Sequence, residues 1–265
     1  MSKFSANIST LFTEAPLIER FSLAAAAGFS SVEIQFPYVL EKSAIKEQLR
    51  KHNLTLSLIN LPAGSLDKGE LGIACLPDRT SEFKQAVSLA AQYATFLEVP
   101  KVNCLAGIKP ADLTESMAEK TLLKNLNYAA SYFQNLDILL LIEAINTEDI
   151  ENFFLSTSTK SINIINQLNG NNVKFQYDCY HMQIMEGNLI KTITQNINDI
   201  GHIQIADVPG RGEPNSGEIN FSNIFNALTL LGYTDYIGLE YFPIKDTQNG
   251  LAALEQLLNL KGELS

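Results

Sequence analysis

Oxygen-bearing side chains recur at regular intervals in this chain, each one at or near the end of a largely apolar run. Residues 138–146 read ILLLIEAIN, so Glu143 ends a stretch that is apolar on every face. Three further residues lie at or near the ends of predicted strands: Asp178 follows VKFQY, Gln204 lies within HIQIAD, which Asp207 ends, and Glu240 follows YIGL. A carboxylate in apolar surroundings is costly unless it is paired or bound to a cation. The four residues are therefore candidates for one shared site.

Three carboxylates and one amide would repel one another if they converged without a cation. A hard divalent ion resolves this conflict, because Mg²⁺ and Mn²⁺ prefer carboxylate and carbonyl oxygens. Zn²⁺ is less favoured, since the four candidates include no His or Cys. The sequence therefore predicts a metal set of Glu143, Asp178, Gln204 and Glu240. The alternative for each residue alone is that it ends a strand and caps the next helix.

Three basic or titratable residues are candidates for contact with a substrate. His181 lies three residues after Asp178 in DCYHMQ, so it is expected near the same site, although a lone His at such a place is often structural. Arg211 lies in the Gly- and Pro-rich stretch PGRGEPNSGEIN, where it is either a surface arginine or the cation that binds an anionic substrate. Lys101 is a weaker candidate for that cation, because it opens its strand.

An alternation of strand and helix accounts for the spacing of these residues. Apolar runs predict strands at 4–9, 31–36, 54–61, 101–105, 138–143, 173–178, 200–207 and 236–241. Amphipathic segments between them predict helices, among them one near 158–169, one after Gly187 and a last one at 251–260. Such alternation favours a parallel sheet with right-handed crossovers.

Eight units of roughly 30 residues are the size of a (β/α)8 barrel. The predicted fold class is therefore α/β, with residues 1–265 forming a single TIM-barrel domain. An open doubly wound sheet is the alternative, but it calls for a Gly-rich phosphate turn after the first strand, and NISTLFTEAP offers none. Active sites of barrels lie at the C-terminal ends of the strands, where the four candidates would meet. Glu33 and Asn60 are expected at similar positions in the second and third strands.

Composition excludes several classes of function. The 265 residues are 46% hydrophobic and carry a formal net charge of −10, which argues against a nucleic-acid partner but leaves a small anionic substrate open. No apolar run reaches the roughly 18 residues of a membrane span, and no signal-peptide core is visible, so we expect a cytoplasmic protein without a membrane partner. Cys75, Cys104 and Cys179 are scattered and are expected as buried, reduced thiols. The oligomeric state is open, a homo-oligomer included, and loop 62–78 is either a lid or a subunit contact.

Several long segments together resemble one known family. NCLAG, LLLIEAIN, YDCYHMQIMEG, GHIQIAD, GRGEPNSGEIN and GLEY, with FSANIST and NLPAG, resemble the hydroxypyruvate isomerases. These enzymes belong to the xylose-isomerase-like barrel superfamily, which also holds sugar epimerases, inosose dehydratases and endonuclease IV repair enzymes. The resemblance runs in order from about residue 4 to residue 250.

The resemblance implies roles for individual residues. Glu143 and Glu240 would be the acid–base pair, and the metal set would fall on Glu143, Asp178, Gln204 and Glu240. Neighbouring sugar epimerases have a histidine where this chain has Gln204, which is a weaker, neutral ligand. A metal therefore need not be obligatory, and no nucleotide cofactor is implied. His181 and Arg211 match positions that contact substrate oxygens.

The implied reaction interconverts hydroxypyruvate and tartronate semialdehyde through an enediolate, so the implied partner is a small 2-oxo acid. A four-carbon 2-oxo-tetronate would react by the same chemistry, and sugar epimerisation or polyol dehydration would suit the same barrel. A nuclease is disfavoured, because its cluster of histidines and zinc ions does not match a chain with three His. A barrel that binds ligand without turnover is the alternative from a different class.

Overall fold

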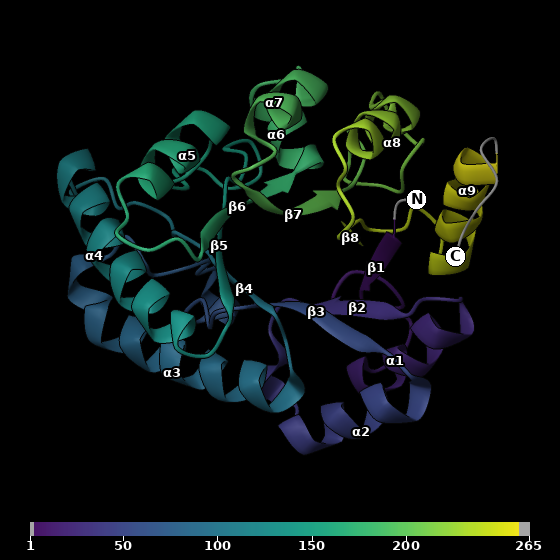
Figure 1. The fold of residues 1–265 in the computed structure, drawn as a ribbon, viewed down its shortest axis with the longest axis horizontal. Coiled ribbons are helices and arrows are strands. Elements are labelled where there is room, and N and C mark those ends of the chain that lie inside the picture. The colour runs from purple at the N-terminus through teal and green to yellow at the C-terminus, as the bar shows by residue number, and fades with distance from the viewer. Residues whose placement is uncertain (1–2, 260–265) are drawn as a thin grey trace.

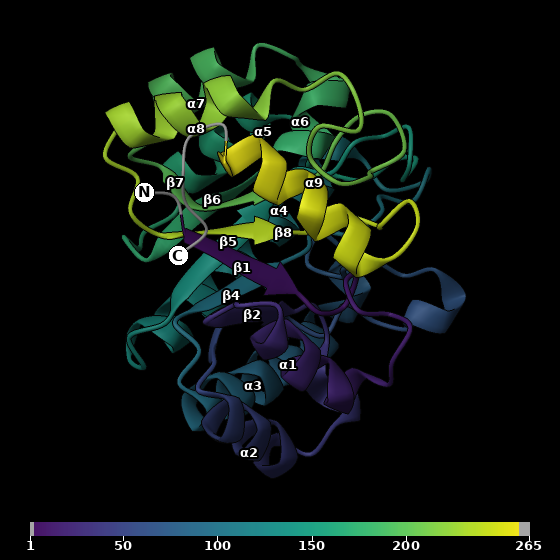
Figure 2. The ribbon, with the colours of Figure 1, turned by 90° about the vertical axis from the view of Figure 1, so that its right-hand side faces the viewer.

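Eight parallel strands form a closed barrel in the computed structural model, which describes residues 3–259. The strands neighbour one another in chain order, and β1 pairs with β8 to close the ring (Figure 1). Their bounds are β1 (Lys3–Asn7), β2 (Ser31–Ile34), β3 (Thr55–Asn60), β4 (Lys101–Cys104), β5 (Leu139–Glu143), β6 (Val173–Asp178), β7 (Ile200–Ile205) and β8 (Tyr236–Leu239). Figure 2 shows β1 and β8 side by side and running in the same direction. The predicted (β/α)8 barrel is confirmed.

Helices surround the barrel on its outside (Figure 1). Over the described residues they are α1 (Leu17–Ala26), α2 (Lys42–His52), α3 (Thr80–Leu97), α4 (Glu115–Gln134), α5 (Ser158–Asn166), α6 (Cys179–Met185), α7 (Leu189–Asn196), α8 (Phe221–Leu230) and α9 (Thr247–Asn259). Their apolar faces cover the outward-facing side chains of the strands, such as Leu140 and Ile142 of β5, which explains why that face of each strand is apolar. Gly28 follows α1 with φ +90°, the left-handed conformation expected of a residue that ends a helix.

The structure adds to the expected helices at two places. The short helix α6 follows β6 without a loop, because the Asp178 carboxylate accepts the backbone N–H of Tyr180 and caps it. A seven-residue segment that contains His and Met gives too weak a periodic pattern to be predicted. Helix α9 begins at Thr247, four residues before the expected start, and residue 260 of the expected helix lies outside the described residues.

Much of the interior of this barrel is polar, whereas layers of Val, Ile and Leu usually fill a TIM barrel. Near the N-terminal ends of the strands, the Ser5 hydroxyl lies 3.1 Å from that of Ser31 and 2.9 Å from that of Ser57. Glu33 lies in the same interior at 0% exposure, bonded to His202 and Gln204, so it belongs to the layer below the rim and not to the rim itself.

Lys101 lies at the end of the barrel opposite the expected site. As the first residue of β4, its ammonium pairs with Asp235, which directly precedes β8, and lies 3.5 Å from Nδ1 of His202. Its charge is therefore engaged far from the C-terminal ends of the strands, and the expectation that it could bind a substrate anion there is wrong. The reason is positional: a residue that opens a strand enters the barrel from its N-terminal end.

Two further observations concern the cysteines and the helices. All three cysteines are free and buried, as predicted for reduced thiols. Among residues 3–259, no helix combines the length and the apolarity that crossing a membrane requires.

Candidate active site

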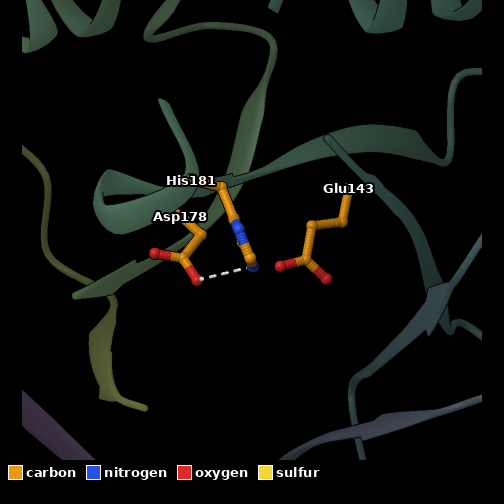
Figure 3. Close-up of side chains that lie close together, drawn as sticks. All are labelled: Glu143, Asp178 and His181. Atoms are coloured by element: carbon orange, nitrogen blue, oxygen red, sulfur yellow. Dashed lines mark ion pairs between the residues drawn. The ribbon is translucent and has the colours of Figure 1, made fainter. Parts of the chain in front are cut away.

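Glu143, Asp178 and His181 converge at the C-terminal ends of β5 and β6. A ligand atom from each lies within 4.8 Å of those of the other two. The side chains come from the last residue of β5, the last residue of β6 and the first turn of α6. Figure 3 shows the tip of the His181 ring between the two carboxylates, with Nε2 3.6 Å from Oδ2 of Asp178. All three residues are at least 96% buried, so the cluster lies in a medium of low polarity.

Arg211 joins this cluster to Glu240. Its Nη2 lies 3.2 Å from Oδ2 of Asp178 and 3.7 Å from Oε2 of Glu240, which follows β8. The guanidinium also lies over the Tyr180 ring, with 5.1 Å between the guanidinium carbon and the ring centroid. Arg211 is thus a partly buried cation that faces two carboxylates, and the surface-arginine interpretation does not apply.

Burial and like charge shift the pKa values of the acidic groups. Desolvation, followed by the charges of Glu240 and Asp178, raises the pKa of Glu143 well above its ordinary value. Desolvation also raises the pKa of Glu240 to about 7, although Arg211 opposes this shift. The pKa of Asp178 is raised by desolvation as well, against the charge of Arg211. Carboxyl groups poised in this way exchange protons more readily near neutral pH than exposed ones do.

Each of the two glutamates has a carboxamide partner. Asn103, in β4, donates its Nδ2–H to Oε2 of Glu143 at 2.8 Å. Gln35, directly after β2, donates its Nε2–H to Oε1 of Glu240. In both cases one carboxylate oxygen is held and the other is left for the site. Neither amide was predicted from the sequence, because the prediction rested on acidic strand ends, although NCLAG and SVEIQF place an amide at the corresponding point of their strands.

Gln204 is oriented towards the layer beneath the cluster. Its Nε2–H donates to Oε2 of Glu33 at 2.8 Å, and its Oε1 accepts from Nε2 of Gln176 at 2.6 Å. It pairs in register with Asp178 on one side and with Gly238 on the other. A Cβ at Gly238 would lie 2.6 Å from the Glu33 carboxylate oxygens, so glycine makes the room for this buried charge. Both ends of the Gln204 amide are therefore engaged by residues of that layer.

The loop after β7 positions Arg211. Asp207 is fully buried, and its carboxylate accepts four backbone N–H groups of that loop, from residues 208, 215, 217 and 219. Arg211 itself has φ +56°, and its carbonyl accepts the backbone N–H of Phe242, which ties the loop to the segment after β8. In the sequence Asp207 is only the last residue of the predicted strand 200–207, and its role in the loop is visible only in three dimensions.

Glu143 and Asp178 of the cluster, together with Glu240 on the other side of Arg211, have the charge and donor type to hold a divalent cation. Glu143, Asp178 and Glu240 carry three carboxylates, and Arg211 carries one positive charge. When all three are ionised, the excess is two negative charges, which one divalent ion neutralises. Oxygen donors predominate, as Mg²⁺ and Mn²⁺ prefer. Burial lowers the pKa of His181 well below its ordinary value, so the ring adds no charge.

Comparison with known proteins gives the same picture of the fold and adds relatives. The model of a family described as "xylose isomerase-like TIM barrel" matches residues 21–257. The hydroxypyruvate isomerase of Escherichia coli K12 is 45% identical over 251 residues, which cover 95% of this chain and 97% of that protein. A 2-oxo-tetronate isomerase of Cupriavidus necator is 38% identical, over 97% of this chain and 99% of that protein.

One solved structure is similar over nearly its whole length. A crystal structure titled "AP endonuclease, family 2", from Brucella melitensis, superposes with a TM-score of 0.94 at 38% identity. The alignment covers 97% of this chain and 99% of that one. The similarity extends over the whole barrel, including the ends of β5, β6, β7 and β8, which carry the candidate site.

Proposed function

The chain belongs to the xylose isomerase-like TIM-barrel family as an enzyme of its hydroxypyruvate isomerase branch, and from this premise we propose that it interconverts hydroxypyruvate and 2-hydroxy-3-oxopropanoate (tartronate semialdehyde). The observation that carries the proposal is a pair of buried glutamates, Glu143 and Glu240, at the ends of β5 and β8 with Arg211 beside them. Two poised carboxyl groups are what a reaction that moves a proton between adjacent carbons requires. The names of two relatives, both isomerases of small 2-oxo acids, support the same reaction class.

The proposed path is a proton transfer through an enediolate. One glutamate removes a proton from C3 of hydroxypyruvate, and the electron pair of that C–H bond becomes the C2–C3 double bond. The carbonyl oxygen on C2 becomes an oxyanion and takes up the proton that the C3 hydroxyl gives up. The other glutamate donates a proton to C2, which leaves an aldehyde at C3. Desolvation of Glu143 and Glu240 supports this role, because it brings their pKa values towards the working pH.

Arg211 and His181 would bind the substrate oxygens. The Arg211 fork is a suitable partner for the carboxylate of a 2-oxo acid, since a guanidinium binds a carboxylate with two parallel hydrogen bonds. His181, between the two carboxylates of its cluster, would face the oxygens on C2 and C3. Asn103 and Gln35 would hold the two glutamates in place while protons move.

Glu143, Asp178, Gln204 and Glu240 would hold a divalent cation, Mg²⁺ or Mn²⁺. Such a cation supplies electrostatic stabilisation of the enediolate oxygens when bound. Arg211 already supplies one positive charge to the same carboxylates, so we propose that the metal assists and is not obligatory. No nucleotide cofactor is part of the proposal.

Proton NMR of the full chain with hydroxypyruvate in D₂O tests the function. We expect tartronate semialdehyde to appear and deuterium to enter the carbon-bound positions. Glu143→Gln and Glu240→Gln should each lower the rate by a factor of about 10² to 10⁴, the usual worth of a general acid or base. The exposed Glu148→Gln is the matched control and should leave the rate unchanged. The proposal would be overturned if neither product nor deuterium exchange appeared with EDTA, with added Mg²⁺ or with added Mn²⁺.

A four-carbon 2-oxo-tetronate is the second candidate substrate, because relatives of that name are also 38% identical to this chain. The chemistry at C2 and C3 is the same, and the two substrates differ by one hydroxymethyl group. The ratio of kcat/KM for the two substrates decides between them. A ratio above about tenfold in favour of the three-carbon acid supports hydroxypyruvate, since one methylene-sized group is worth about that much discrimination.

The proposal includes the setting in which the enzyme works. We propose that the chain acts as one domain in the cytoplasm on a small 2-oxo acid, without nucleic-acid or membrane partners. A ligand-binding barrel without activity is the alternative of a different class. It predicts that hydroxypyruvate binds without exchange of its carbon-bound hydrogens, and that Glu143→Gln binds it equally well.

A further inference from the structure

Two N–H donors converge on one nitrogen of His181. The backbone N–H of Asn146 donates to Nδ1 of the ring at 3.3 Å, and Nδ2 of the Asn146 side chain lies 2.8 Å from the same atom. Asn146 follows Glu143 by three residues, in the segment that leaves β5. One short segment therefore supplies both an acidic residue of the cluster and the contacts that hold the histidine next to it.

The orientation of the Asn146 amide follows from an obligatory donor. Its Oδ1 lies 2.7 Å from the backbone nitrogen of Asp149, and a backbone N–H can only donate. Nδ2 must then face the other way, where it contacts both Oδ2 of Asp149, at 2.9 Å, and the His181 ring. The Tyr180 hydroxyl donates to the same Asp149 oxygen at 2.8 Å and holds that carboxylate in place. The Asp149 N–H thus fixes the orientation of the Asn146 amide, and with it the direction of the contact to the His181 ring.

The network determines which nitrogen of His181 carries the proton. Since Nδ1 accepts from two N–H groups, it cannot carry a hydrogen of its own. That excludes both the Nδ1–H tautomer and the doubly protonated ring, and it leaves the neutral ring with its hydrogen on Nε2. Nε2 is the atom that faces Oδ2 of Asp178 at 3.6 Å and lies beside Glu143 (Figure 3). The ring therefore presents an N–H, and not a lone pair, to the centre of the site.

We propose that Asn146 is a positioning residue that fixes His181 as the neutral tautomer with its hydrogen on Nε2, the form in which the ring can donate to substrate but cannot ligate a metal through that atom. A histidine that ligates a metal offers a lone pair to the ion and donates its other N–H to a neighbouring acceptor. His181 has the reverse arrangement. Glu143, Asp178 and His181 have the spacing of a metal triad, but a cation at this centre would be held by oxygen atoms alone.

The lock has a consequence for turnover, and this part rests on the proposed function. A neutral imidazole N–H stabilises an enediolate oxyanion without giving up its proton, as a donor fixed in advance of the reaction. Since the bond strengthens as the oxyanion develops, its loss should lower kcat more than it raises KM. Contacts that orient such a group are typically worth a factor of 10 to 100 in activity.

Nitrogen NMR of the full chain, labelled with ¹⁵N in its histidine rings and measured as purified at pH 8, tests the lock directly. The chain has three histidines, and His181→Gln identifies the signals of His181 by their absence. We expect an unprotonated Nδ1 and a protonated Nε2 for this ring. A protonated Nδ1, or a metal-bound Nε2, would overturn the proposal. The measurement needs neither substrate nor turnover, so it stands if the proposed function fails.

Asn146→Ala tests the functional part, with Glu148→Gln as the control two residues away on an exposed position. We expect kcat to fall about 10- to 100-fold with KM changed less than about threefold. The ¹⁵N signals of His181 should move towards each other, because one of the two donors to Nδ1 is lost. A fall in kcat with unchanged His181 signals would show that Asn146 does not act through this ring.

Discussion

Glu240 is a carboxyl group whose ionisation the fold opposes. It is 4% exposed, and burial raises its pKa from 4.5 to about 7 despite the nearby guanidinium of Arg211. A group whose pKa is higher in the folded state than in the unfolded state favours folding while it is protonated. That contribution is complete below the unfolded value and is lost as pH rises through the folded value. The raised pKa that suits Glu240 for proton transfer is therefore expected to lower the stability of the protein above neutral pH.

Glu240→Gln should remove this loss. In metal-free buffer we expect the free energy of unfolding of the wild type to fall between about pH 5 and pH 8 relative to that of the variant. The variant should then be more stable at about pH 8 by roughly 1 to 3 kcal/mol, because each pKa unit corresponds to about 1.4 kcal/mol. Urea unfolding at the two pH values measures the difference.

Glu148→Gln, which replaces an exposed glutamate, is the control for that comparison and should follow the wild type at both pH values. If Glu240→Gln loses as much free energy of unfolding between about pH 5 and pH 8 as the wild type does, the loss does not come from ionisation of Glu240. In either case the variant is expected to lose most of its activity. The same substitution therefore measures separately what the ionisable group contributes to catalysis and how much it lowers stability.

The loop between β7 and α8 is the element that carries Arg211, and its shape depends on one buried carboxylate. Asp207 accepts four backbone N–H groups, two on each oxygen, at 2.9 to 3.0 Å. Gly217 allows the chain to close around it, since a Cβ there would lie 2.0 Å from the carbonyl oxygen of Val208. The loop is rich in Gly and polar residues, yet the four hydrogen bonds to Asp207 form a cage of N–H groups that fixes the backbone from which Arg211 extends.

Asp207→Asn should therefore affect both stability and binding. The amide replaces one acceptor oxygen by a donor that faces two N–H groups, which should destabilise the fold by roughly 2 to 5 kcal/mol. We expect KM for the 2-oxo acid to rise about tenfold, with a smaller change in kcat, because Arg211 loses its support. Steady-state kinetics at a temperature where the variant is folded measures this. Glu218→Gln, exposed in the same loop, is the control. An unchanged KM would mean that Arg211 finds its position without the cage.

The elements show what the sequence could and could not predict. The strands could be predicted because each is a largely apolar run such as Leu139–Glu143, and amphipathic segments long enough for a helix lie between them. Glu143, Asp178 and Glu240 were readable as acidic ends of such runs. The contact of Arg211 with Asp178 was not, because it joins a loop to a strand 33 residues away and depends on the φ of +56° that the loop imposes. The role of Asn146 was equally hidden, since it depends on a ring 35 residues further along the chain.

At the scale of the whole molecule, a line of hydrogen bonds runs along the interior of the barrel. It begins at Asp235 and Lys101 near the N-terminal ends of the strands, passes through His202 and Glu33, and reaches Gln204 below the site. Inward-facing positions alternate with outward ones along every strand, and His202 and Gln204 take two inward ones in β7, so the sequence contains these polar residues at inward-compatible positions. They could not be told from surface residues without the register that places them inside. Buried networks of this kind rigidify a core when every member has a partner.

The charge of the whole site determines how the protein should respond to divalent cations. Of three buried carboxylates, those of Asp178 and Glu240 face the Arg211 guanidinium and that of Glu143 lies within range of its charge, and the surrounding barrel offers them little solvent. Because the His181 ring presents an N–H, ligands for a cation are expected to be oxygens, which favours Mg²⁺ or Mn²⁺ over Zn²⁺.

After EDTA treatment at about pH 8, Mn²⁺ at 100 times its Kd should stabilise the fold by about 2.7 kcal/mol, or roughly 5 °C in Tm. The shift should be abolished in Glu143→Gln, which removes one ligand and one charge. No shift with Mg²⁺ or Mn²⁺ at millimolar concentration would contradict the metal set. Arg211 would then be the cation on which the three carboxylates depend, and EDTA should leave the rate of isomerisation unchanged.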